Sequence, residues 1–216
     1  MKPSKKTIRV LIADDHEIVR QGFKTILGDT SDLSVVGEAN NGNEAIDFIK
    51  KNDVDVVVLD FDMPEKNGLD TLIELKSLKP KLPVLILSIF SEEHYGTRFL
   101  KAGASGYLGK ASASDLLVEA VRKIANGGKY ISPELTNKLV EGLNHDSEKP
   151  PHEILTDREF QVFRLIAEGN KLTEIADKLF LSVNTVSTYK SRILEKLDMK
   201  SNAELIHYAI KNDLIN

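Results

Sequence analysis

Short apolar runs alternate with stretches of helical period over the first 130 residues of the chain. The apolar runs lie at 8–13, 33–37, 54–59, 84–87 and, more weakly, 106–108. After them, apolar residues recur at three- and four-residue spacing, as in EIVRQGFKTIL, NEAIDFIKK, GLDTLIELKSL, SEEHYGTRFLKAG and SDLLVEAVRKIANGG. Five strands alternating with five helices predict an α/β fold, a doubly wound five-stranded parallel sheet.

The pattern changes beyond residue 130. A short helical candidate, PELTNKLVEGL, precedes the polar stretch NHDSEKPPHE, in which two consecutive prolines favour an extended spacer. From residue 154 onward only helical periods occur, with helices expected at about 157–168, 172–179, 183–197 and 202–211. We therefore predict an α/β domain over 7–130, a linker with a short helix over 131–153, and a small all-α four-helix domain over 154–216.

Helix-capping residues support the C-terminal boundaries. Thr156 with Glu159, and Ser201 with Glu204, have the spacing of a capping box. Ser182 is placed to cap the third of these helices.

Polar side chains follow four strands of the predicted sheet, at the point where each strand ends. Asp14 and Asp15 follow the first strand, Asp60 the third, Ser88 the fourth and Lys110 the fifth. In an open parallel sheet, ligands bind outside the carboxyl ends of the strands, near the point where the strand order reverses. We expect these five side chains to share one site.

Three crowded carboxylates raise each other's pKa values unless a cation shares the site. An oxygen-rich set without cysteine suits Mg²⁺, which takes one or two carboxylates and phosphate oxygens. An aspartate beside such a metal can attack a phosphoryl donor. Lys110 and Ser88 then supply the charge and the hydroxyl that bind the transferred group.

Each of these residues alone has a simpler explanation. Asp14 and Asp15 could cap the following helix, and Ser88 and Lys110 could be ordinary surface groups. Asp62 could be a turn residue before Pro64. The placement of the set at successive strand ends favours a common site.

The motifs IADDHEIVRQG, VVVLDFDMPEKNGL, VLILS and KAGASGYLGK resemble the receiver domain of two-component response regulators, which has a flavodoxin-like sheet. The resemblance implies that Asp60 is the phosphoacceptor, that Ser88 and Lys110 bind the phosphoryl group, and that Tyr107 is the aromatic residue that moves on activation. For the metal it implies direct ligation by Asp15, a largely water-mediated role for Asp14, and the backbone carbonyl of Asp62.

This sequence departs from the receiver pattern at two positions. Ile89 follows Ser88 where a smaller residue is common, and Asp62 adds negative charge beside the acceptor. A strand ending in DFD also resembles the nucleophile motif of haloacid-dehalogenase-type phosphatases, a Mg²⁺-dependent alternative. That family expects a threonine or valine where Pro64 stands, and further acidic residues late in the domain.

The C-terminal region carries nine basic and nine acidic residues over 154–216, unlike a strongly basic DNA-binding domain. Small polar side chains nevertheless recur at i, i+3, i+4 and i+7 along one predicted helix, as Asn184, Ser187, Thr188 and Ser191. Such a stripe can approach base edges. A solvated face of a helical bundle is the alternative, but a short helix, a tight turn and a second helix favour a helix-turn-helix.

The segments LTDREFQVFRLIAEG, TEIADKLFLSVNTVSTYKSRILEKL and SNAELIHYAI resemble the four-helix LuxR-type DNA-binding domain, so the whole chain resembles a NarL/FixJ-type response regulator. By position, Ser187, Thr188 and Ser191 are implied to face bases. Phosphate contacts are expected from Thr185, Lys190 and Arg192. Relatives often carry a basic residue at position 187 and histidine at 189, where this chain has Ser187 and Tyr189.

The composition and charge of the chain exclude several other classes of site and protein. The chain has 216 residues and a formal charge of -4, and it contains no cysteine for disulfides, thiolate metal sites or cysteine nucleophiles. We find no export signal and no membrane-spanning run, and expect a cytoplasmic protein that is not an enzyme. The expected function is phosphorylation-activated transcriptional regulation, with a sensor histidine kinase as phosphoryl donor, double-stranded DNA as target and a homodimer on activation. The alternative is a phosphorylation-independent DNA-binding regulator whose receiver serves for dimerisation or docking.

Overall fold

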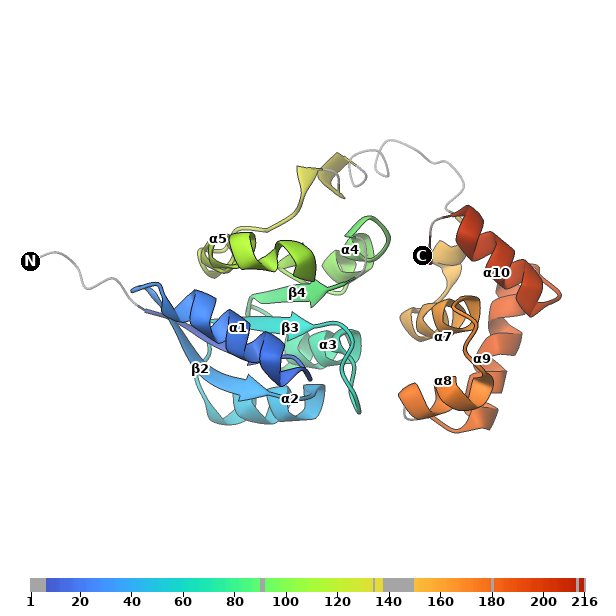
Figure 1. Ribbon diagram of the computed structural model, residues 1–216, viewed down its shortest axis with the longest axis horizontal. Coiled ribbons are helices and arrows are strands. Elements are labelled where there is room, and N and C mark those ends of the chain that lie inside the picture. The colour runs from blue at the N-terminus through green and yellow to red at the C-terminus, as the bar shows by residue number, and fades with distance from the viewer. Residues whose placement is uncertain are drawn as a thin grey trace, which may run out of the picture. The chain divides into compact units, whose positions relative to one another are not determined.

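The computed structural model describes residues 7–89, 92–133, 135–137, 150–179, 181–212 and 214–215. The chain forms two compact units, Met1–Asn144 and His145–Asn216 (Figure 1). The predicted short helix of the linker falls largely outside the described residues, which include 133 and 135–137 of it in helical conformation. No helix within the described ranges is long and apolar enough to cross a membrane.

The first unit contains a five-stranded parallel sheet, as predicted. Its strands, joined in the order β2-β1-β3-β4-β5, are β1 (Ile8–Ala13), β2 (Leu33–Ala39), β3 (Val56–Asp60), β4 (Val84–Ser88) and β5 (Gly106–Gly109). All neighbouring pairs run parallel. The strand order reverses between β1 and β3, so the carboxyl ends of these two strands border the crevice where such sheets bind ligands.

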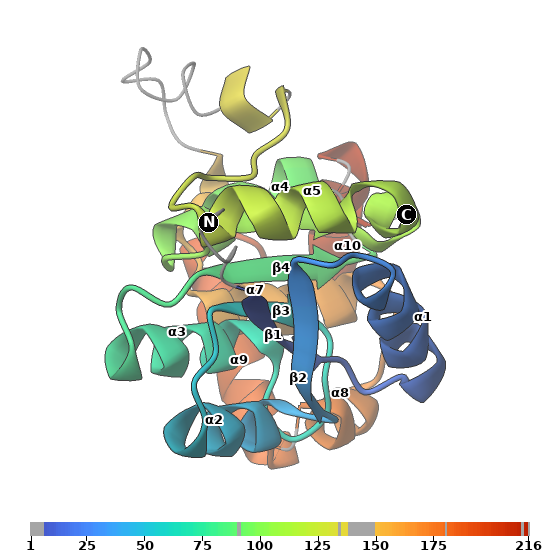
Figure 2. The same cartoon turned by 90° about the vertical axis from the view of Figure 1, so that its left-hand side faces the viewer.

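Five helices cover the sheet: α1 (Glu17–Gly28), α2 (Gly42–Lys51), α3 (Gly68–Leu78), α4 (Glu92–Lys101) and α5 (Ala113–Ala125), with a one-turn 3₁₀ helix, η1 (Lys110–Ser112), before α5. The helices α1 and α5 pack on one face (Figure 2), where Leu27 and Leu117 join a core with alternate residues of the strands. Every residue of β3 and β4 is buried, so both faces of the sheet are covered.

The loop from β3 to α3 turns back against the strand that precedes it. The Gly68 amide donates to the Phe61 carbonyl over 2.9 Å. A Cβ at Gly68 would lie 2.3 Å from the Asp60 carbonyl oxygen, so only glycine permits this approach. The Asn67 side chain caps α3 by accepting from the amide of Asp70. The loop therefore holds the end of β3 in a fixed position.

The second unit contains the predicted four helices, α7 (Asp157–Ala167), α8 (Leu172–Lys178), α9 (Val183–Lys196) and α10 (Asn202–Lys211), preceded by the 3₁₀ turn η2 (Pro151–Ile154). Thr156 and Glu159 form the predicted capping box, and Ser182 accepts from the amide of Thr185. Ser201 caps α10 as predicted, while the Glu204 carboxylate accepts from the Lys200 amide. The buried side chains Phe163, Ile175, Val186, Ile193 and Leu205 come from all four helices.

Candidate functional site

A lysine joins two buried carboxylates at the carboxyl edge of the sheet. Asp60 ends β3, Asp14 directly follows β1, and Lys110 directly follows β5. The Lys110 Nζ lies 2.7 Å from Asp14 Oδ2 and 2.8 Å from Asp60 Oδ2. The three residues are separated by up to 96 positions in the sequence, and the order of the strands brings them together as predicted.

The electrostatics of this cluster follow from its burial. Desolvation raises the pKa of Asp60 to about 6, because the hydrogen bond and charge of Lys110 only partly oppose it and Asp14 adds to it. Burial by itself would lower the pKa of Lys110, but hydrogen bonds to Asp14 and Asp60 outweigh it and raise that pKa. Lys110 therefore remains a cation, and Asp60 is a carboxylate that further positive charge would stabilise.

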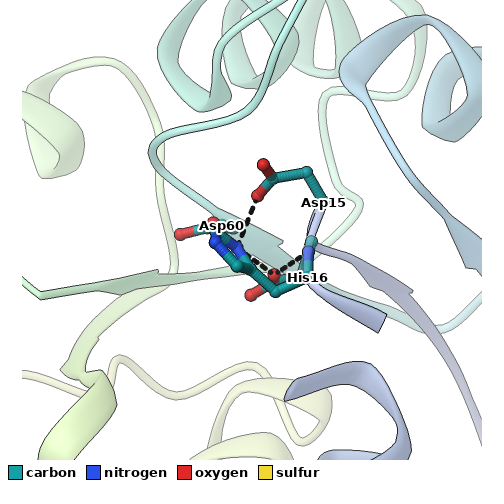
Figure 3. A group of neighbouring side chains, drawn as sticks. Asp15, His16 and Asp60 are labelled. Atoms are coloured by element: carbon teal, nitrogen blue, oxygen red, sulfur yellow. Dashed lines mark hydrogen bonds and ion pairs between the residues drawn. The ribbon is translucent and has the colours of Figure 1, made fainter. Parts of the chain in front are cut away.

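Asp15 and His16 complete the acidic cluster (Figure 3). One side-chain ligand atom from each of Asp14, Asp15, His16 and Asp60 lies within 4.8 Å of the others. Asp15 Oδ1 is buried and accepts no hydrogen bond from the described residues, although His16 Nδ1 lies 2.8 Å from it. The His16 amide also donates to Asp14 Oδ1 over 2.8 Å. A crowded set of carboxylate oxygens, including this buried oxygen of Asp15, fits a hard divalent cation such as Mg²⁺.

A buried arginine fixes the backbone beneath this cluster. Arg20 is 8% exposed, and its guanidinium donates to the Asp14 carbonyl oxygen over 2.6 Å. Its Nε lies 3.5 Å from the carboxylate of Glu38 on β2. Glu38 also contacts Lys24, whose hydrogen bond lowers the pKa of Glu38. The ion pair with Glu38 compensates the buried charge of Arg20. The hydrogen bond from Arg20 to the Asp14 carbonyl holds the turn that carries Asp14 and Asp15.

The remaining predicted receiver residues lie around the same edge. Ser88 is buried at the end of β4 and aligns with Gly109, the residue before Lys110. The Asp62 amide bonds to the Asp60 carboxylate, which opposes the rise in its pKa. The Asp62 side chain is exposed and outside the acidic cluster, so any metal contact of this residue is left to its backbone. Ile89 is 74% exposed.

Aromatic rings connect the residue after Asp60 to the predicted switch residue. Phe99 of α4 makes an edge contact with Phe61, with ring centroids 5.3 Å apart. The Phe99 ring also lies 5.9 Å from that of Tyr107, and Tyr95 lies 5.4 Å from Phe61. Tyr107 is 1% exposed, so its side chain points inward. Through these rings α4 therefore contacts both the residue after β3 and Tyr107 of β5.

In the second unit, α9 presents the predicted polar stripe to solvent. The stripe residues Asn184, Ser187, Thr188 and Ser191, and also Arg192, are exposed, while Thr185 and Lys190 are half-buried. Val186 and Ile193 on the opposite side are fully buried. Tyr189 is half-buried, as expected for a residue at the margin of the core.

The hydroxyl groups of this stripe partly bond to their own helix. Thr188 Oγ1 donates to the Asn184 carbonyl over 2.9 Å, and Ser191 Oγ donates to the Ser187 carbonyl over 3.1 Å. In these rotamers the hydroxyl oxygens present acceptors outward. Such acceptors match the exocyclic amino groups of adenine or cytosine in the major groove.

Two residues of the acidic site were missed at the level of sequence. His16 has no metal-ligand spacing to another histidine, so the sequence gives no signal for its place in the cluster. Arg20 occupies the buried side of α1 with Phe23 and Leu27, at i, i+3 and i+7. A charged residue on the apolar face of a predicted helix is a signal that could have identified it.

Comparison with known protein families agrees with this arrangement in both units. Residues 10–122 match the family described as response regulator receiver domain. Residues 153–209 match the bacterial regulatory proteins of the luxR family. The fold and the acidic edge define a receiver, and the second unit is a LuxR-type helix-turn-helix domain. These matches favour the receiver interpretation over the phosphatase alternative.

Similar proteins extend over the whole chain. The oxygen regulatory protein NreC of Staphylococcus carnosus is 38% identical, covering 97% of this chain and 100% of NreC. The response regulator GacA of Pseudomonas aeruginosa is 36% identical, covering 97% and 98%. A structure of the response regulator RcsB of Salmonella typhimurium is 29% identical with a TM-score of 0.71, covering 94% and 96%. The chain belongs to the NarL/FixJ-type two-component response regulators, which are DNA-binding transcription regulators.

Proposed function

We propose that Asp60 accepts a phosphoryl group from a sensor histidine kinase and that this modification regulates DNA binding by α9. The observation that carries the proposal is the contact of Lys110 Nζ with both Asp14 and Asp60 at the edge where the strand order reverses. In the transfer, an Asp60 oxygen forms the new bond to phosphorus while the phosphorus–nitrogen bond of phosphohistidine breaks and the imidazole leaves.

A Mg²⁺ ion would be held by Asp15 and Asp60, with Asp14 and the backbone carbonyl of Asp62 beside it. When bound, it would supply positive charge that offsets repulsion between the carboxylates and the incoming phosphate oxygens. Lys110 is already placed to contact an added phosphoryl oxygen, because its ammonium touches Asp60. Ser88, buried at the end of the adjacent strand, would donate its hydroxyl to the same group.

On the DNA side, we propose that α9 enters the major groove with Ser187, Thr188 and Ser191 toward the bases. Thr185, Lys190 and Arg192 would contact phosphates, and Asn184 lies at the start of the same face. One of the similar solved structures, 29% identical, is a complex of RcsB with DNA. We further propose that the active form is a homodimer on two half-sites and that the protein acts in the cytoplasm.

The test compares the wild type with Asp60→Ala after incubation with acetyl phosphate and Mg²⁺. Intact-mass spectrometry is expected to show one added phosphoryl group in the wild type and none in the variant. DNA pull-down sequencing on the same samples is expected to recover a two-fold symmetric site more efficiently with the phosphorylated protein. An unmodified wild type that recovers the same DNA would instead support the phosphorylation-independent alternative.

A further inference from the structure

The start of the linker is docked on α4 at Glu92 and Gly96. Leu135 is fully buried, and its Cδ2 atom occupies the space beside Gly96, 2.4 Å from where a Cβ at Gly96 would stand. The Ser132 amide donates to the Glu92 carboxylate over 3.2 Å. We call Ser132, Leu135 and Thr136 the docking turn. The lack of a side chain at Gly96 makes room for the leucine.

Hydrogen bonds within the docking turn and before it fix its conformation. Ser132 Oγ accepts from the Leu135 amide, and the Ser132 carbonyl accepts from the Thr136 amide, each over 3.0 Å. Just before the turn, Tyr130 bonds through its backbone to both Ser105 and Tyr107. The chain after α5 therefore runs beside β5, the strand that carries Tyr107, and then contacts α4.

The two contacts of α4 lie side by side. Phe99 contacts Phe61 and Tyr107, while Gly96, three residues earlier and so on the same side of the helix, holds Leu135. The first residue of α4, Glu92, follows Ser88 by only four positions and contacts Ser132. A shift of Ser88 or Tyr107 that displaces α4 would alter the geometry of the linker contact. Packed elements of this kind switch between discrete arrangements rather than deforming continuously.

We propose that the side of α4 around Glu92 and Gly96 is a docking surface for the chain's own linker, and that phosphorylation of Asp60 releases the docking turn from it. The proposal rests on the function proposed above for Asp60. Because coupling between two sites is reciprocal, release of the turn must favour the phosphorylated state by the same factor. The docking turn therefore transmits the state of the acidic site to the chain that leads to the DNA-binding unit.

The test uses the full chain and the substitution Gly96→Ala. Alanine favours the helix over glycine, so α4 is expected to keep its fold, while the added methyl displaces Leu135. Hydrogen exchange of the peptide that contains Ser132 and Leu135 is expected to be slow in the wild type, and fast in the variant. Beryllofluoride with Mg²⁺ is expected to make the wild-type peptide exchange fast as well.

The reciprocal effect is measured by calorimetric titration with beryllofluoride. Gly96→Ala is expected to bind it more tightly by about 5-fold or more, the lower end of common allosteric coupling. The control is Leu135→Ala, which removes the docked side chain directly and should give the same gain. In the double variant, Gly96→Ala should add nothing to Leu135→Ala, because the two changes disrupt one contact.

The outcomes separate the two proposals. A wild type that does not bind beryllofluoride would overturn the role of Asp60 and, with it, the release of the turn by phosphorylation. Binding without faster exchange of the docking turn, or equal affinity in the wild type and Gly96→Ala, would overturn the linker proposal alone. Additive effects of Gly96→Ala and Leu135→Ala would also contradict it.

Discussion

Lys196 at the end of α9 forms an ion pair with Glu159 in the first turn of α7, with 2.7 Å between Nζ and Oε2. Glu159 is 3% exposed and also accepts from the Thr156 amide over 2.7 Å. One carboxylate therefore caps one helix and attaches a second to it. Because α9 carries the proposed DNA contacts, this pair fixes the orientation of the recognition surface within its own unit.

The Glu159–Lys196 pair predicts a pH-dependent stability of the DNA-binding unit. Burial would raise the pKa of Glu159, but Lys196 and Thr156 outweigh it and hold that pKa below its ordinary value. The stabilisation is thus present above the ordinary glutamate pKa and is lost as the pH falls through the lowered folded value. Glu159→Gln keeps a capping side chain and is expected to cost about 1 kcal/mol at pH 7.

The measurement is native-state hydrogen exchange of α7 and α9 in the full chain, at neutral and acid pH. The difference between the wild type and Glu159→Gln should disappear in acid, when Glu159 is protonated in both states. Glu204→Gln on α10 is the matched control, since the Glu204 carboxylate caps its helix through Lys200 and Ser201. An equal loss of hydrogen-exchange protection in Glu204→Gln would show that the effect of Glu159→Gln comes from helix capping alone, without the ion pair.

Removal of Lys110 is expected to make the receiver depend on Mg²⁺ for stability. Lys110→Met leaves Asp14 and Asp60 buried without their shared cation, a change that costs about 3 kcal/mol in buried ion pairs. A divalent cation should relieve the repulsion, so saturating Mg²⁺ should raise the melting temperature more in the variant than in the wild type. Lys101→Met, at an exposed position of α4, is the control in the same thermal scans. If Mg²⁺ raised the melting temperature of all three proteins equally, the prediction would be contradicted.

Arg20 is expected to position the metal site without taking part in the chemistry. Arg20→Met removes the donor to the Asp14 carbonyl, and loss of such supporting contacts weakens metal binding by about 10-fold. Calorimetry should therefore show weaker Mg²⁺ binding, while phosphorylation by acetyl phosphate recovers at saturating Mg²⁺. Lys24→Met, which removes another partner of Glu38, should leave Mg²⁺ affinity unchanged. A phosphorylation defect that persists at saturating Mg²⁺ would argue for a direct role.

Two glycine substitutions are expected to have opposite effects on stability. Gly68→Ala places a methyl 2.3 Å from the Asp60 carbonyl and should lower the free energy of unfolding of the receiver by about 2 kcal/mol. Gly22→Ala lies within α1 with no atom within 4 Å of its Cβ, and it should raise stability by about 0.5–1 kcal/mol. Denaturant unfolding followed on receiver peptides by hydrogen exchange measures both. A stable Gly68→Ala protein would show that the loop after β3 can relax.

A phosphate contact by Arg192 predicts a change in salt dependence rather than in base preference. Arg192→Ala should weaken binding to all sequences similarly and reduce the slope of log K against log salt by about 1. By contrast, Ser187→Ala should alter preference at one base position while leaving the slope unchanged. Titrations of both variants at several salt concentrations distinguish the two roles. A change in preference with Arg192→Ala would move that residue into the base-contacting set.

Local signals explain why most of the fold could be predicted. The bounds of β1 and α3 agree with their apolar patterns, and the C-terminal helices differ from prediction by at most one residue at their ends. Those helices carry their own caps, Thr156, Ser182 and Ser201. β2 extends two residues further, to Ala39, because its pairing with β1 continues beyond the apolar run.

Contacts that depend on the path of a loop or linker could not be predicted, whereas those set by the strand order could. The contact of Asp14, Asp60 and Lys110 could be predicted from their positions at strand ends, because a parallel sheet brings the carboxyl ends of its strands to one edge. The proximity of His16 to Asp15 depends on the turn before α1, and the docking of Leu135 on Gly96 depends on the path of the linker. Neither residue pair has a periodic or spacing signal.

Tyr130 also determines where an isolated receiver fragment can end. It forms a bridge with Gly106 on the side of β5 that β4 does not occupy, satisfying backbone groups on both sides of that residue. The family match ends at residue 122, inside α5. A fragment that stops there would expose an open strand edge, a template for intermolecular pairing and aggregation. A well-behaved isolated receiver should therefore extend beyond Tyr130.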